Sequence, residues 1–268
     1  MPCVRWNPSS LSPWLLSEDD EFAYFLGAVL PDALFYDLPS FRFSSLGRAL
    51  HRLEGEACLP VLLSLLREPG KELSPEMIAW ALGVASHFLA DAGWHPVIEK
   101  MSAPDTVSCR TFKLSRAQCH HWLESELEGY WLSRIGPADG YVQLLKRFTK
   151  RSRTGDNCIG YFRMLLMRVG LEEVPSLKRI GRCLLRQALL VYQFSLASWA
   201  RWQKPLLKVR ATRSLGALIV PALANLSPQL FQGGCQQAEI SEDPFNHEFF
   251  ARSVISLARH QHALLQRL

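Results

Sequence analysis

The chain has 268 residues, of which 48% are hydrophobic and 21% charged, and its formal net charge is +5. This length and composition allow a sizeable core and exclude an intrinsically disordered chain. The positive charge is too small to indicate a nucleic-acid-binding protein by itself. Seven scattered cysteines without a CxxC pair, and an N-terminus that does not read as a signal peptide, favour reduced thiols and a cytoplasmic location. No apolar run is long enough, without proline, to span a bilayer.

Helical periodicity dominates the sequence, and strand signals are poor. The expected helices cover, in chain order, residues 18–30, 40–53, 57–68, 76–94, 114–135, 138–150, 158–170, 175–202, 214–226 and 246–268. The helix over 76–94 has the clearest start, because Ser74 suits the N-cap and Pro75 the first helical position. Pro96 is expected to end or restart this helix. We therefore predict an all-α protein, a multi-helix bundle.

A basic and polar segment, KRSRTGDN at residues 150–157, suggests a division of the chain. Residues 1–155 carry the candidate metal ligands and are predicted to form a metal-binding helical part. Residues 156–268 lack such a set. They are predicted either to complete the same bundle or to form a small appended helical subdomain.

The segment SHFLADAGWHP places His87, Asp91 and His95 four residues apart. Residues four apart share one face of a helix, and imidazole and carboxylate are common zinc ligands. The pair of His87 and Asp91 could instead form a hydrogen bond of about 1 kcal/mol. However, a buried carboxylate needs a cation, and the surrounding ALGVASHFLADAGW contains no Lys or Arg.

The next long helix repeats this spacing in CHHWLE, where His120 and Glu124 are four apart. His121, three residues before Glu124, remains an alternative to His120. Earlier in the chain, Asp32 lies at the end of the first expected helix and His51 on the second. His51 taken alone reads as an ordinary core histidine.

The ordered set FLGAVLPDALF, a following histidine, ALGVASHFLADAGWHP and HHWLE resembles the zinc-dependent phospholipase C family over about residues 20–130. That family shares its helical fold with fungal single-strand-specific nucleases. The resemblance implies a first zinc ion held by Asp32, His51, His87 and Asp91, and a second held by His95, His120 and Glu124. It also implies that Asp91 reaches towards a third zinc ion and that Asp32 orients and deprotonates the attacking water.

The family's third zinc ion uses the amine of an N-terminal Trp and a nearby His, and this sequence matches neither, since its first His is His51. We therefore expect two zinc ions. The implied activity is that of a zinc-dependent hydrolase, a phosphodiesterase acting on a phosphate ester. A phospholipid head group is a candidate substrate, and nucleic acid is a weaker one. The alternative is a non-enzymatic helical protein that binds metal or a partner through a degenerate zinc site.

Overall fold

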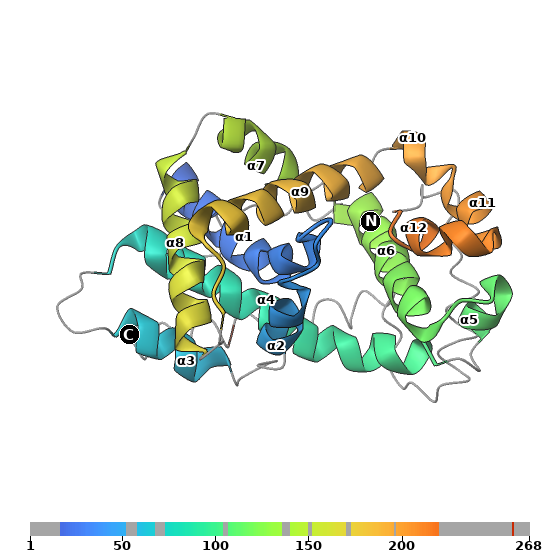
Figure 1. Cartoon of the computed structure of the whole chain (residues 1–268), viewed down its shortest axis with the longest axis horizontal. Helices are drawn as coiled ribbons and strands as arrows, with labels where there is room; N and C mark the ends of the chain where they lie inside the picture. Colours follow the sequence, from blue (N-terminus) through green and yellow to red (C-terminus); the bar gives the residue numbers. More distant parts are fainter. Residues whose placement is uncertain are drawn as a thin grey trace. The chain divides into compact units, whose positions relative to one another are not determined.

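The computed structural model describes residues 17–51, 58–67, 73–103, 107–135, 140–149, 152–169, 173–195, 197–219 and 259. Every regular element within these ranges is helical (Figure 1), which confirms the predicted all-α fold. The elements are α1 (Glu18–Ala33), η2 (Leu34–Tyr36), α2 (Ser44–His51), α3 (Cys58–Leu66), α4 (Pro75–Met101), α5 (Val107–Phe112), α6 (Arg116–Ile135), α7 (Gly140–Thr149), α8 (Arg153–Arg168), α9 (Leu177–Ser195), α10 (Ala197–Ala200), α11 (Gln203–Lys208), η4 (Arg210–Thr212) and α12 (Arg213–Ala217).

Helix α4 begins as the sequence predicts but does not end where expected. The backbone N–H of Met77 donates to the Ser74 hydroxyl at 3.2 Å, as an N-cap requires. Pro96 was expected to end or restart the helix, yet α4 continues through it to Met101. A proline removes one amide donor, and Ile98 and Met101 beyond it are buried in a hydrophobic cluster that favours continuation. The expected helix over 246–268 lies outside the described residues, apart from position 259.

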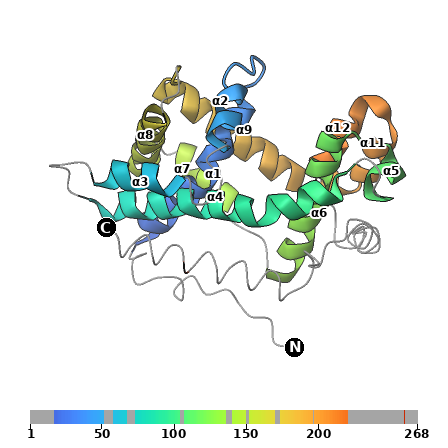
Figure 2. The same cartoon turned by 90° about the horizontal axis from the view of Figure 1, so that it is seen from below.

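The chain divides into two compact units. Of the described residues, one unit contains those within 17–92 and 140–190 and residue 259. Its core is built from buried residues of α1, α3, α4, α8 and α9, among them Leu26, Leu66, Trp80, Phe162 and Leu184. Helix α1 contacts α2, α7 and α8 (Figures 1 and 2). Helices α8 and α9 thus contribute buried residues to the same core as α1, and both the predicted division at residue 155 and the role of the part after it stay predictions.

Two glycines allow α1 and α4 to cross with their backbones in contact. A Cβ atom built on Gly27 would lie 2.0 Å from the carbonyl oxygen of Trp80. A Cβ atom on Gly83 would lie 2.0 Å from the carbonyl oxygen of Tyr24. Any side chain at either position would force the helices apart, so these glycines fix the register of α1 against α4.

The segment after α1 is tied to α9 by a buried carboxylate. Asp37 is fully buried, and its Oδ1 accepts from Nε of Arg179 at 2.5 Å. Its Oδ2 accepts from the hydroxyl of Ser40 at 2.8 Å and from the backbone N–H of Phe43 at 3.2 Å. Arg186 of α9 donates to the backbone carbonyl of Leu38. Helix α9 therefore anchors the chain between Asp32 and His51.

Of the described residues, the other unit contains those within 93–135 and 191–219. Helix α6 packs against α12, and α12 against α11. Trp122, Leu123 and Leu207 are buried in its hydrophobic cluster. The hydroxyl of Ser125 donates to the backbone carbonyl of Ala217 at 2.8 Å, which fixes one face of α6.

The cysteines differ from the sequence expectation at one position. Cys158 and Cys183 are buried free thiols, but Cys119 is disulfide-bonded. The expectation of reduced cysteines therefore fails at Cys119. Among the described helices, none has the length and apolarity needed to cross a membrane.

Candidate metal centres

The first candidate centre, called the Asp32 group here, brings together Asp32 of α1, His51 of α2, and His87 and Asp91 of α4. The Nε2 atoms of His51 and His87 are 3.0 Å apart. Oδ1 of Asp32 lies 3.0 Å from Nε2 of His51 and 3.9 Å from Nε2 of His87. Oδ2 of Asp91 lies 3.3 Å from Nε2 of His87 and 3.6 Å from Nε2 of His51. The Nε2 atom of each histidine therefore lies near one carboxylate oxygen of Asp32 and one of Asp91.

Backbone carbonyls fix the orientation of both histidine rings. Nδ1 of His87 donates to the carbonyl of Ala28 at 2.9 Å, and Nδ1 of His51 donates to the carbonyl of Gly47 at 2.8 Å. Because a carbonyl only accepts, each Nδ1 carries a proton, and the neutral ring then turns the lone pair of Nε2 towards the other ring. Two such lone pairs at 3.0 Å need a cation between them. A proton or a metal ion can supply it.

The electrostatics of the Asp32 group favour a bound cation. Burial lowers the pKa of His87, but the charge of Asp32 and the hydrogen bond and charge of Asp91 outweigh burial and raise it to about 9. Burial also lowers the pKa of His51, and the hydrogen bond to Asp32 raises it overall. Both histidines thus hold protons more strongly than usual, His87 because of Asp32 and Asp91 and His51 because of Asp32.

The geometry of the Asp32 group fits zinc. Zinc bonds to nitrogen and oxygen of about 2.0–2.1 Å place tetrahedral ligand atoms roughly 3.3 Å from one another. The five distances above, from 3.0 to 3.9 Å, lie around that value. Ligand atoms of Asp32, His51 and His87 all lie within 4.8 Å of one another. Carbonyl-anchored imidazoles with carboxylates are a donor set typical of zinc.

The second candidate centre, called the Glu124 group here, consists of His95 of α4 and His120 and Glu124 of α6. Their ligand atoms also lie within 4.8 Å of one another. Oε1 of Glu124 lies 3.0 Å from Nε2 of His120 and 3.8 Å from Nε2 of His95. Two imidazoles and one carboxylate leave room for a further ligand, as catalytic zinc sites do.

His121 contacts the Glu124 group from its outer side. Its Nδ1 lies 3.2 Å from Oε2 of Glu124, the oxygen that His120 does not contact, and its side chain is 54% exposed. Burial raises the pKa of Glu124, but hydrogen bonds from His120 and His121 outweigh burial and lower it to about 2. Of the two histidines that sequence spacing allows, His120 lies with His95 and Glu124.

All seven ligand candidates fall into these two groups, four in the first and three in the second. The contributions that sequence analysis missed are the carbonyls of Ala28 and Gly47, which no residue type signals. Arg147 of α7, three residues before the basic segment, is already engaged in contacts within its own unit. Arg147 donates to Asp19 at 2.6 Å and lies 4.5 Å from the ring centre of Phe22.

The fold and the two groups define an all-α protein with histidine–carboxylate centres suited to zinc. The model of the family described as zinc dependent phospholipase C matches residues 9–169, well over half of the chain. The chain therefore belongs to the zinc-dependent phospholipase C family. The match extends beyond residues 20–130 on both sides and includes α8. No curated protein and no solved structure matches the chain.

Proposed function

We propose that the chain is a zinc-dependent hydrolase of phosphate esters that uses the Asp32 and Glu124 groups. The observation that carries this proposal is the pair of carbonyl-anchored histidines, His51 and His87, whose Nε2 atoms face each other between two aspartates. Zinc held by such sets lowers the pKa of water to about 7 and offsets negative charge on a phosphate.

The residues of the Asp32 group divide into holding and reacting roles. His51 and His87 are held by their Nδ1–carbonyl bonds and are 13% and 10% exposed, so they act as fixed ligands. Asp91, 18% exposed, supports both rings from within α4. Asp32 is 42% exposed and is the member most open to solvent. Its carboxylate is therefore the group proposed to orient the attacking water and to accept its proton.

The proposed reaction is hydrolysis at phosphorus. The water oxygen forms a bond to phosphorus, its proton passes to the carboxylate of Asp32, and the bond to the ester oxygen breaks. The departing oxygen takes up a proton from solvent. The substrate class proposed is a phosphodiester, with a phospholipid head group as one member.

The test combines zinc content with hydrolysis. Elemental analysis of untagged protein purified without chelators should give two zinc ions per chain, and Asp91→Ala should lose about one of them. Asp156→Ala is the matched control, because Asp156 is an exposed aspartate of α8 outside both groups. Bis(p-nitrophenyl) phosphate measures diester cleavage, which Asp91→Ala should abolish and Asp156→Ala should retain.

Two results would contradict the proposal in different ways. Background zinc in the unaltered protein would remove both candidate centres. Two zinc ions without cleavage of any phosphate ester would favour the alternative, a non-enzymatic metal-binding protein. Circular dichroism of each variant establishes that the helical fold is intact.

A further inference from the structure

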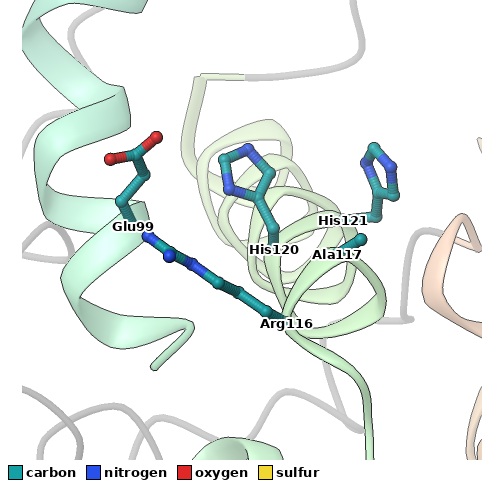
Figure 3. A pocket seen from close by; sticks show the side chains of 5 residues that line it. All are labelled: Glu99, Arg116, Ala117, His120 and His121. Carbon is teal, nitrogen blue, oxygen red and sulfur yellow. The ribbon is translucent and has the colours of Figure 1, made fainter. Parts of the chain in front are cut away.

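A pocket of about 490 Å³ adjoins the Glu124 group. It is lined by Glu99, Arg116, Ala117, His120 and His121 (Figure 3). Pockets that bind small ligands typically have volumes of about 300–1,000 Å³. His120 belongs both to this pocket and to the Glu124 group, so a ligand in the pocket lies next to the candidate metal ligands.

Helical spacing places a second charged layer beside the ligand layer. Arg116 precedes His120 by four residues on α6, just as His120 precedes Glu124. On α4, Glu99 follows His95 by four residues. One helical turn is about 5.4 Å, so Glu99 and Arg116 form the layer one turn from His95 and His120.

Arg116 is available to a ligand. Its side chain is exposed and makes no hydrogen bond or ion pair with another residue that the structure describes. Figure 3 shows it extended from α6 towards α4, the helix that carries Glu99. Guanidinium stays charged at all relevant pH values and presents a fork of donors that matches carboxylates and phosphates.

We propose that Arg116 forms an anion-binding subsite that selects phosphate esters carrying a second anionic group. The inference rests on the proposed function, because the first anionic group is the phosphate at the Glu124 group. The second group must lie about one helical turn from the phosphorus. A carboxylate or a further phosphate a few bonds away meets this requirement.

Glu99 provides an opposite test of the same subsite. Its carboxylate lines the pocket and opposes an incoming anion, so removing its charge should strengthen the binding that Arg116 provides. A merely structural role for Arg116 does not predict opposite effects at these two positions.

The experiment compares glycerol 3-phosphate with 3-phosphoglycerate, which carries a carboxylate where the former has a hydroxymethyl group. Isothermal titration calorimetry of the zinc-loaded full chain at low ionic strength gives both dissociation constants. We expect 3-phosphoglycerate to bind about tenfold more tightly, the effect of one charge-assisted contact. Arg116→Ala should abolish this preference, and Glu99→Gln should increase it. Arg110→Ala, an exposed arginine of α5 outside the pocket, should leave it unchanged.

Any of the following results would overturn the proposed subsite at Arg116. Equal affinities in the unaltered protein, or a preference that survives Arg116→Ala, would remove the subsite but leave the phosphate-ester function standing. Failure of both compounds to bind would count against the proposed function, and the subsite would fall with it. A preference that persists at high salt would also contradict a contact between exposed charges.

Discussion

The substitution Gly83→Ala tests whether the contact between α1 and α4 builds the Asp32 group. The added Cβ would lie 2.0 Å from the carbonyl oxygen of Tyr24 and 2.9 Å from the backbone nitrogen of Ala28. Both neighbours are backbone atoms of α1, so no side chain can rotate away. The helices must separate by about 1 Å to reach the 3.0 Å that real Cβ contacts keep.

Two opposing contributions set the change in the free energy of unfolding that Gly83→Ala causes. Overpacking of this kind costs about 1–3 kcal/mol, and alanine recovers up to roughly 1 kcal/mol through its higher helix propensity. The expected effect of Gly83→Ala on zinc affinity at the Asp32 group is larger than its effect on stability. His87 lies one turn after Gly83, and its Nδ1–Ala28 bond of 2.9 Å crosses the same helix interface. A separation of about 1 Å breaks that bond, and the loss of such a partner typically weakens metal affinity by about 10–100-fold.

The assay measures the free energy of unfolding in urea by circular dichroism, and the zinc dissociation constant against a competing chelator. Gly160→Ala is the matched control, since a Cβ on this glycine of α8 meets no atom within 4 Å. The control should be stabilised by about 0.5–1 kcal/mol with zinc affinity unchanged. The reasoning would be refuted if Gly83→Ala matched Gly160→Ala in both quantities.

Two further predictions concern charge. Arg179→Met should cost roughly 3–5 kcal/mol at neutral pH, because it leaves the buried carboxylate of Asp37 without its guanidinium. Burial raises the pKa of Asp37, but hydrogen bonds from its neighbours and the Arg179 charge hold it below 3.8. The stabilisation is therefore present above pH 3.8 and lost as the pH falls through the lower folded pKa, so urea denaturation should show the variant approaching the unaltered protein in acid. In zinc-free protein, the pKa of about 9 for His87 predicts stability that is present below pH 6.5 and lost as the pH rises through 9. It also predicts that zinc binding near neutral pH releases a proton, measurable by calorimetry in buffers of different ionisation enthalpy; zinc binding without proton release would contradict it.

The sequence predicts those features that depend on neighbours along one helix. The cap at Ser74 and the four-residue spacing of His87 with Asp91 and of His120 with Glu124 are local properties, and α4 and α6 present them accordingly. The periodicity over 175–202 likewise identifies helices α9 and α10. Such features need no knowledge of which helices pack together.

Features that join distant segments were not predictable in this way. Asp37 and Arg179 are 142 positions apart, and nothing in the sequence around either residue indicates that the two form a pair. Glycine inside a helix usually weakens it, whereas at Gly83 the missing side chain lets α1 touch α4. The sequence predicts that Pro96 ends or restarts the helix, but packing of the residues beyond Pro96 outweighs one missing hydrogen bond.

The Asp32 group shows why a ligand pattern alone does not make a metal site. The four-residue spacing places His87 and Asp91 on one face of α4. The same spacing would hold if the imidazole ring of His87 pointed away from the other ligands. The direction of the His87 ring comes from the carbonyl of Ala28, and that carbonyl is within reach only because glycines let α1 approach α4. The ring of His51 is oriented instead by the carbonyl of Gly47, one turn earlier on the same helix α2. Side chains thus supply the donor atoms, while the approach of two backbones decides where their lone pairs converge. A substitution at Gly83, a residue that contacts no ligand, should therefore weaken metal binding as a substitution in the group itself does.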